Sequence, residues 1–104
     1  MNNVNEKSVL NLAGIAYRAR KVTLGVDTII SDIQNGRVSF VLIASDAQKN
    51  SKKQLLDKCH TYNVSHAEVA NRQALGSAVG KQDRVAIGIM DKGFARKFQS
   101  LLQK

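Results

Sequence analysis

The stretch GVDT, Gly25–Thr28, combines residue types that suit a binding surface. Gly25 stands immediately before an amphipathic stretch, and Asp27 would lie in the first turn of the helix that this stretch predicts. The first N–H groups of a helix lack partners within it and carry a partial positive charge, so they can bind a phosphate or the acceptor edge of a base. Gly25 would let another backbone come close. Asp27 has two interpretations: it stabilises the helix by facing its dipole, or it accepts hydrogen bonds from a guanine.

The residues that could support catalysis or hold a metal do not form a known pattern. Cys59 lies on the apolar face of a predicted helix, which favours a buried structural thiol over a nucleophile. His60 and His66 give no recognised zinc spacing with Cys59. GSAVGK, Gly76–Lys81, is one residue shorter than a phosphate-binding P-loop, lacks the following Ser or Thr, and follows a helix instead of preceding one. We therefore expect no enzymatic activity, no metal and no cofactor.

The charge balance indicates an anionic partner. Lysine and arginine number 16 against 8 acidic residues, which gives a net charge of +8 and a pI of about 10.0. This excess is typical of proteins that bind phosphate-rich polymers or anionic surfaces, and nucleic acid is the leading class. A protein that is merely basic is the alternative. No apolar run approaches the ~20 residues of a membrane-spanning helix, the N-terminus does not resemble a signal peptide, and there is one cysteine, so we expect a cytoplasmic protein with no membrane partner.

Basic residues occur in three groups that could contact phosphates. These candidates are Arg18, Arg20 and Lys21 before the GVDT stretch, Lys49, Lys52 and Lys53 after an apolar strand, and Lys81 and Arg84 in a later loop. A solvated surface charge is the alternative for each. Aromatic residues are few, and Phe40, Phe94 and Phe98 are expected in the core. The sequence therefore predicts no aromatic platform for stacking single-stranded nucleic acid.

Five helices follow from apolar residues at helical spacing. Their inward residues are Val9, Leu12, Ala13 and Ala16; Val26, Ile29, Ile30 and Ile33; Leu55, Leu56 and Cys59; Ala74, Leu75, Ala78 and Val79; and Phe94, Phe98, Leu101 and Leu102. The first helix ends in the basic cluster Arg18–Lys21, and Gly36 ends the second. No repeat, low-complexity tract or linker separates these elements, so one domain over residues 1–104 is expected.

Three strands are predicted between these helices. Val38–Ala44 is almost entirely apolar, which is typical of a strand covered on both faces. RVAIGIM, residues 84–90, is a second central strand, and a short strand lies around His66–Ala70. Alternating helices and strands predict an α/β fold, a three-layer α/β/α sandwich on a small mixed, partly parallel sheet.

Several segments resemble a known family. LAGIAYRARKVTLG, GRVSFVLIASDA, DKCHTYNV, ALGSAVGKQDRVAIGI and DKGFARKF occur in the order found in short bacterial YlxQ-type members of the L7Ae/L30e superfamily of ribosomal proteins. The resemblance covers almost the entire chain. It implies the same α/β/α sandwich and the binding of kink-turn RNA. It also implies a binding surface made by the start of the second helix and the loop after LGSAVG.

The family motif G-x-N-E-x-x-K falls on Gly25, Asp27, Thr28 and Ser31 in this chain. Gly25 is retained, whereas Asp27 stands for asparagine, Thr28 for glutamate and Ser31 for lysine. By this resemblance Gly25, Val26, Asp27 and Thr28 would meet sheared G·A base pairs. Asp27 can still accept from guanine and Thr28 can donate or accept, but Ser31 brings no charge to a phosphate.

The sequence thus predicts a non-enzymatic, ribosomal-protein-like RNA-binding protein that recognises a kink-turn or a similar bent internal loop. Lys81 and Arg84 would contact the loop side of the RNA, and the RARK and KK clusters its phosphates. The partner expected is structured RNA, with ribosomal RNA as one candidate, and no small-molecule substrate is expected; the free protein would be a monomer. The alternative is a protein–protein adaptor whose basic face binds an acidic partner. An RNA-modifying enzyme is disfavoured because no cofactor motif is present.

Overall fold

The computed structural model describes residues 3–102 and contains five helices and four strands in this range. In chain order they are α1 (Asn3–Arg18), β1 (Val22–Leu24), α2 (Val26–Gln34), β2 (Phe40–Ile43), α3 (Lys49–Thr61), β3 (Ser65–Glu68), α4 (Arg72–Ala78), β4 (Ala86–Ile89) and α5 (Lys92–Leu102). Among the described residues, no helix has the length and apolar character needed to cross a membrane.

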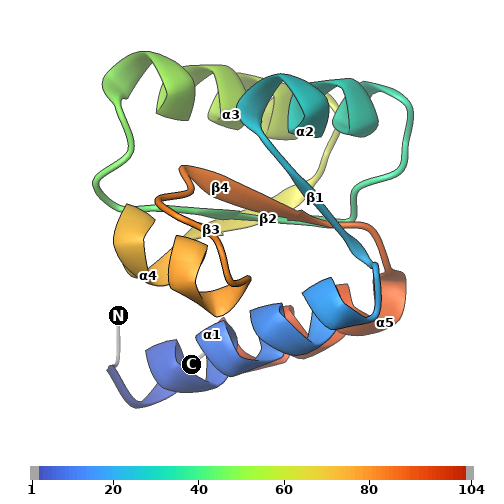
Figure 1. Cartoon of the computed structure of the whole chain (residues 1–104). Helices are drawn as coiled ribbons and strands as arrows, with labels where there is room; N and C mark the ends of the chain where they lie inside the picture. The colour runs from blue at the N-terminus through green and yellow to red at the C-terminus, as the bar shows by residue number, and fades with distance from the viewer. Residues whose placement is uncertain (1–2, 103–104) are drawn as a thin grey trace.

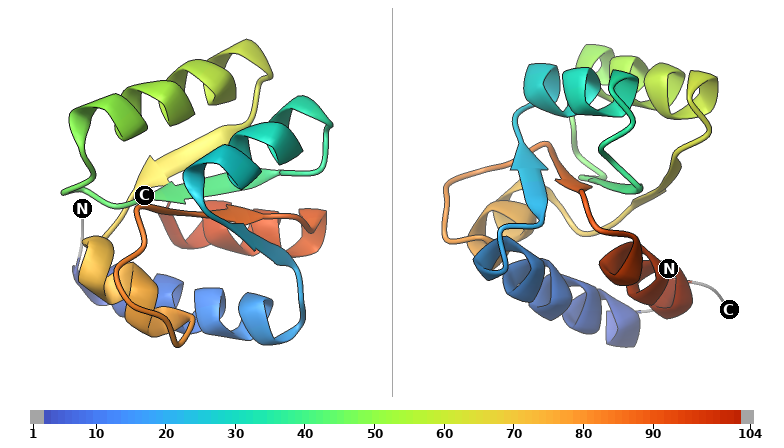
Figure 2. Two further views of the ribbon diagram at one scale, coloured as in Figure 1. Left: turned by 45° about the horizontal axis from the view of Figure 1, so that its top comes forward. Right: turned by 90° about the vertical axis from the view of Figure 1, so that its right-hand side faces the viewer.

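The four strands form one mixed sheet in the order β1-β4-β2-β3. β4 pairs antiparallel with both β1 and β2, and β3 pairs parallel with β2. Helices α2 and α3 cover one face, while α1, α4 and α5 cover the other (Figures 1 and 2). The predicted three-layer α/β/α sandwich on a mixed, partly parallel sheet is therefore confirmed.

The central strands are apolar on both faces because helices cover both faces. Phe40 and Leu42 pack in the core beneath α1, α4 and α5, and the alternate residues Val41 and Ile43 pack in the core beneath α2 and α3. All four residues of β2 and all four of β4 are buried. The run of β2 is apolar throughout because helices cover both faces of the sheet, as the sequence predicted.

Cys59 is 1% exposed and packs in the core beneath α2 and α3. Burial raises the pKa of its thiol from 9.0 to about 11, which keeps it protonated at neutral pH. The prediction of a buried structural thiol is confirmed. Within residues 3–102 no group of three or more metal-ligating side chains comes together.

The structure differs from the sequence-based elements mainly at β1. Val22–Leu24 forms a strand, so the basic cluster after α1 leads into a strand and not directly into a helix. This strand has three residues at the edge of the sheet, which is too short for a periodic pattern to show. β3 begins and ends earlier than His66–Ala70, and β2 and β4 are shorter than their apolar runs because the ends of those runs lie in the flanking loops, partly buried around β4.

Candidate functional site

Four loops meet at one end of the sheet, and we call them together the loop edge: residues 25–28, 44–48, 70–72 and 79–85. The strand pairing explains why they meet. Leu24 at the end of β1 pairs with Ile87 near the start of β4, and Ile43 at the end of β2 pairs with Ala86 and with Glu68. Chain segments that leave β1, β2 and β3 therefore emerge beside the segment that enters β4. The start of α2 and the α4–β4 loop therefore emerge at the same end of the sheet, although they are far apart in sequence. Asp27 and Asp83, for example, are 56 residues apart.

The start of α2 is open. Gly25 precedes the helix with φ +90°, a conformation that favours glycine, and no side chain caps the helix. The first helical hydrogen bond runs from the Ile29 N–H to the Gly25 carbonyl at 2.8 Å, so the N–H groups of Val26, Asp27 and Thr28 lie outside the helical pattern. A Cβ at position 25 would meet only Thr28 Oγ1, at 3.7 Å. Gly25 is exposed, and among residues 3–102 a side chain there would meet no atom at less than van der Waals distance.

Asp27 and Ser31 lie on exposed positions of α2, one helical turn apart. Within residues 3–102 the Asp27 carboxylate forms no ion pair. It lies in the first turn, where the helix dipole favours a negative charge. Because it is exposed and unpaired, it also keeps its full capacity to accept hydrogen bonds from a ligand.

Two arginines of the α1–β1 turn lie beside the start of α2. Arg18, Arg20 and Thr28 line one surface hollow of about 580 Å³ along the outer side of β1, and no acidic residue lines it. Lys21 is placed differently: its carbonyl accepts from the Met90 N–H at 2.8 Å, at the far end of β1. The structure thus joins Arg18 and Arg20, but not Lys21, to the start of α2.

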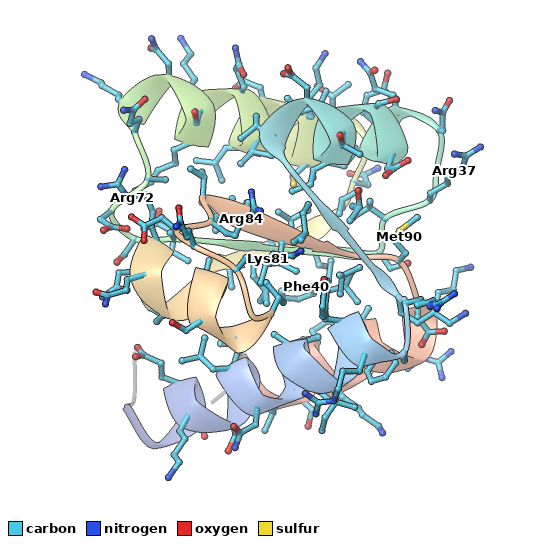
Figure 3. The ribbon with its side chains drawn as sticks, viewed as in Figure 1. Arg37, Phe40, Arg72, Lys81, Arg84 and Met90 are labelled. Carbon is cyan, nitrogen blue, oxygen red and sulfur yellow. The ribbon has the colours of Figure 1, made fainter. Side chains whose placement is uncertain are left out.

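The α4–β4 loop folds tightly back on α4. A Cβ at Gly76 would lie 1.9 Å from the Gln82 carbonyl oxygen, so only glycine allows this approach. The Lys81 N–H donates to the Gly76 carbonyl at 2.9 Å, and the Arg84 N–H donates to the Arg72 carbonyl at 3.0 Å. These contacts fix the loop that carries both cations at the loop edge (Figure 3).

The two cations of this loop differ in their surroundings. Lys81 is exposed, and its Nζ lies 5.9 Å from the centre of the Tyr17 ring, a cation–π distance that directs it toward α1. Arg84 is half-buried, and its Nε is buried without a hydrogen-bond acceptor among residues 3–102. A buried unsatisfied donor costs about 1–3 kcal/mol. Arg84 therefore has hydrogen-bonding capacity that the described residues do not use.

The lysines of α3 do not form one cluster. Lys52 Nζ donates to the Ser45 carbonyl at 3.1 Å and to Glu68 Oε1 at 3.3 Å, which ties the β2–α3 loop to the end of β3. Lys52 therefore has partners inside the protein, which the sequence did not indicate because Glu68 lies 16 residues away. Lys49 and Lys53 are exposed on the same helix and form no ion pair within residues 3–102.

Two of the acidic residues near these cations, Asp46 and Glu68, are paired, whereas Asp27 and Asp83 form no ion pair within residues 3–102. Asp46 accepts from the Arg72 N–H at 2.8 Å and lies 3.5 Å from Arg72 Nε, and Glu68 pairs with Lys52. These pairs neutralise the β2–α3 and β3–α4 loops and leave the cations around α2 and the α4–β4 loop in excess. The sequence missed the contribution of Tyr17, whose only signal is its place beside the arginines that follow α1.

The family model for the ribosomal protein L7Ae/L30e/S12e/Gadd45 family matches residues 7–99. The chain belongs to this family. It is 45% identical to the RNA-binding protein YlxQ of Bacillus subtilis over 91 residues, which cover 88% of this chain and 91% of the relative. It is 37% identical to the RNA-binding protein YlxQ of Enterococcus faecium over 103 residues, 99% of each chain. The resemblance that the sequence motifs indicated is confirmed.

A solved structure shares this fold. A protein of unknown function from Bacillus halodurans superposes with a TM-score of 0.89 and is 45% identical; the match covers 92% of this chain and 97% of that one.

Proposed function

We propose that this member of the family is a non-enzymatic RNA-binding protein that recognises a kink-turn or a similarly bent internal loop through its loop edge. The observation that carries the proposal is the open first turn of α2, which lies beside the α4–β4 loop. Three N–H groups of α2 lie outside the helical pattern, a Cβ at Gly25 would strike no other atom, and Lys81 and Arg84 lie on the loop that enters β4, the strand paired with β1. The names of the two YlxQ relatives support RNA as the ligand.

The loop edge divides into a part for bases and a part for phosphates. Asp27 accepts hydrogen bonds from guanine N–H groups, and Thr28 donates or accepts beside it. Arg18 and Arg20 line the hollow next to Thr28 and contact phosphates on that side. Lys81 and Arg84 contact the RNA from the α4–β4 loop, while Lys49 and Lys53 add charge from α3. Ser31 contributes no charge, so these cations supply the phosphate contacts.

A bent RNA fits this arrangement better than a straight duplex does. A kink-turn presents backbone phosphates and guanine edges close together, and the start of α2 offers N–H donors and a carboxylate acceptor within one helical turn. A regular RNA duplex hides its base edges in a deep, narrow major groove. The two shapes therefore provide the test.

The experiment compares Gly25→Glu with Gly36→Glu in a gel-shift assay. Both glycines have positive φ and neither has a close neighbour that a Cβ would strike, but Gly36 lies at the other end of α2. Both variants therefore carry the same added charge, and binding is compared where urea unfolding shows both to be folded, because a non-glycine residue at φ 90° and ψ 132° strains the backbone. We expect Gly25→Glu to weaken kink-turn binding at least tenfold, or ~1.4 kcal/mol, and Gly36→Glu to weaken it much less.

The reference RNA has the same sequence except that its G·A pairs are replaced by Watson–Crick pairs. Wild-type protein should bind it much more weakly than the kink-turn, and Gly25→Glu should change that weak binding little. Equal binding of wild type to both RNAs, or equal weakening of both by Gly25→Glu, would show that the start of α2 does not recognise the kink-turn. Displacement of the kink-turn by an acidic polypeptide at a lower concentration than unlabelled kink-turn RNA requires would favour the adaptor function instead.

A further inference from the structure

A second surface lies at the end of the sheet opposite the loop edge (Figure 2, right). Here the end of α2, the α3–β3 turn and α5 surround a hollow of about 490 Å³, which we call the Tyr62 hollow. Its volume falls in the range of about 300–1,000 Å³ that is usual for small-molecule sites. β2 and β3 begin at this end and run away from it, so the hollow is separated from Gly25 by the length of the sheet.

The Tyr62 hollow combines an apolar floor with an exposed aromatic ring. Ile33, Val38 and Ala95 line it and are each less than 10% exposed, whereas Tyr62 is 45% exposed. An exposed ring beside buried apolar side chains is the arrangement on which an unpaired base stacks. Phe40 and Phe98 are buried in the core, whereas Tyr62 is exposed. The sequence predicted no aromatic platform for stacking single-stranded nucleic acid, and Tyr62 is one exposed ring that this prediction did not consider.

The rim of the hollow is positively charged. Lys92 and Arg96 line it from α5, four residues apart and therefore on one face of the helix, and no acidic residue lines it. The acids closest in the chain are engaged: Asp91 accepts from the Phe94 N–H at 2.8 Å, and Asp32 lies 3.7 Å from Arg37. The hollow thus favours a phosphate beside the aromatic ring.

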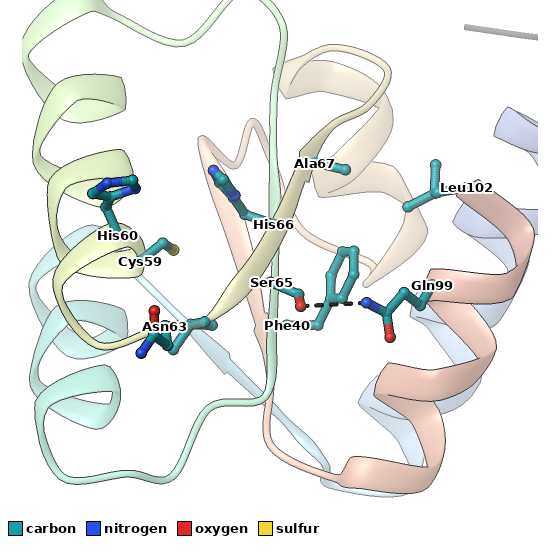
Figure 4. A pocket seen from close by; sticks show the side chains of 10 residues that line it. Phe40, Cys59, His60, Asn63, Ser65, His66, Ala67, Gln99 and Leu102 are labelled. Carbon is teal, nitrogen blue, oxygen red and sulfur yellow. Dashed lines mark hydrogen bonds between the residues drawn. The ribbon is translucent and has the colours of Figure 1, made fainter. Parts of the chain in front are cut away.

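The Tyr62 hollow continues into a neighbouring hollow of about 500 Å³ along the outer edge of β3 (Figure 4). The two share Asn63, Val64, Ser65 and Gln99. Gln99 Nε2 donates to Ser65 Oγ at 3.4 Å between them, so amide and hydroxyl groups that can bond to bases lie along the path. His60 and His66 line the second hollow. Together the hollows provide space for more than one nucleotide.

We propose that this opposite end of the sheet binds single-stranded RNA, with an unpaired base stacked on Tyr62 and its phosphate held by Lys92 and Arg96. This second contact is independent of the loop edge and does not depend on kink-turn recognition. It lets the protein hold a folded RNA element at one end and an unpaired strand at the other. The chain measures about 31 × 28 × 27 Å, so one RNA can span both sites.

The test uses the fact that the chain has only two tyrosines. Fluorotyrosine labelling gives two ¹⁹F resonances, one from Tyr17 of α1 and one from Tyr62, and Tyr62→Phe assigns them. Titration with single-stranded pentaadenylate RNA should shift the Tyr62 resonance saturably and leave the Tyr17 resonance nearly unchanged. Arg96→Gln should weaken this titration at least fivefold. Lys97→Gln is the matched control, because Lys97 extends over Phe94 and does not line the hollow, and it should have little effect.

Three results would overturn the proposal. The first is an unmoved Tyr62 resonance at saturating pentaadenylate. The second is equal weakening by Arg96→Gln and Lys97→Gln, which would indicate general charge attraction. The third is an equal shift by a hexaglutamate peptide, which would indicate an acidic protein partner in place of a nucleotide. Repeating the titration with Gly25→Glu keeps the two sites separate, since pentaadenylate should still shift Tyr62 in that variant whatever happens to kink-turn binding.

Discussion

Replacing Gly76 with alanine would force the α4–β4 loop away from α4. The new Cβ would lie 1.9 Å from the Gln82 carbonyl oxygen and 2.6 Å from its carbon, and real Cβ atoms essentially never come closer than 3.0 Å to another atom. Both neighbours are backbone atoms, so the loop must move by roughly 1 Å. The movement would also strain the hydrogen bond from the Lys81 N–H to the Gly76 carbonyl.

The expected cost follows from opposing terms. Alanine gains up to about 1 kcal/mol over glycine in helix propensity. Overpacking costs about 1–3 kcal/mol, and loss of one hydrogen bond about 1 kcal/mol more. We expect a net loss of about 1–3 kcal/mol in the free energy of unfolding, with Tm lowered by about 4–8 °C for each kcal/mol.

Gly93→Ala in α5 is the matched control for urea unfolding. The nearest atom to a Cβ there is Asp91 Oδ2 at 3.0 Å, which accepts a hydrogen bond from the Phe94 N–H. A small shift would weaken this bond, and the helix propensity of alanine offsets the loss, so stability should change by less than about 1 kcal/mol. Gly76→Ala should also weaken kink-turn binding severalfold at temperatures where it is folded, because Lys81 and Arg84 move with the loop. The expectation is wrong if Gly76→Ala unfolds at the same urea concentration as wild type, or if Gly76→Ala and Gly93→Ala lose equal free energy of unfolding.

Two further predictions concern Cys59 and the lysines of α3. Cys59→Ser should cost about 1–3 kcal/mol in urea unfolding by burying a hydroxyl, with the RNA affinity of the folded protein unchanged; lost affinity at full stability would instead make the thiol functional. Burial raises the Cys59 pKa from 9.0 to about 11. The stability linked to the protonated thiol is therefore fully present below pH 9 and is lost as the pH rises through 11. Cys59→Ala should lack this decline. Lys53→Ala should reduce the slope of log K against log salt by about 0.7–0.9. Lys52→Ala should mainly destabilise the β2–α3 loop and change this slope little. Equal slope changes in the two variants would show that Lys52 leaves Glu68 to contact RNA.

The layers of the fold could be predicted because they depend on local apolar patterns. The run around β2 indicated a strand covered on both faces, and the spacing of Ile29 and Ile33 indicated the inward face of α2; both are buried as expected. The burial of Cys59 followed from the same reasoning. β1 could not be predicted, because its existence depends on pairing with β4, whose partner residues lie 63 to 67 positions away along the chain.

The sequence predicted which residues form the candidate site, but not which other residues their side chains contact. The motif placed Gly25 and Asp27 at the start of a helix, and the structure has them there. Arg18 and Arg20 reach Thr28 only because β1 carries the chain along the edge of the sheet. The ion pair of Lys52 with Glu68 and the approach of Lys81 to Tyr17 join residues far apart in sequence, so no local pattern indicates them.

The place of β4 in the sheet has a consequence for synthesis of the protein. β4 is made after the other three strands of the sheet, yet it lies between β1 and β2 and pairs with both. Until it emerges from the ribosome, β1 has no neighbouring strand, and the start of α2 is not joined to Lys81 and Arg84. A nascent chain that ends before β4 therefore lacks the completed loop edge, and the two halves of that surface come together only once β4 is available to fold.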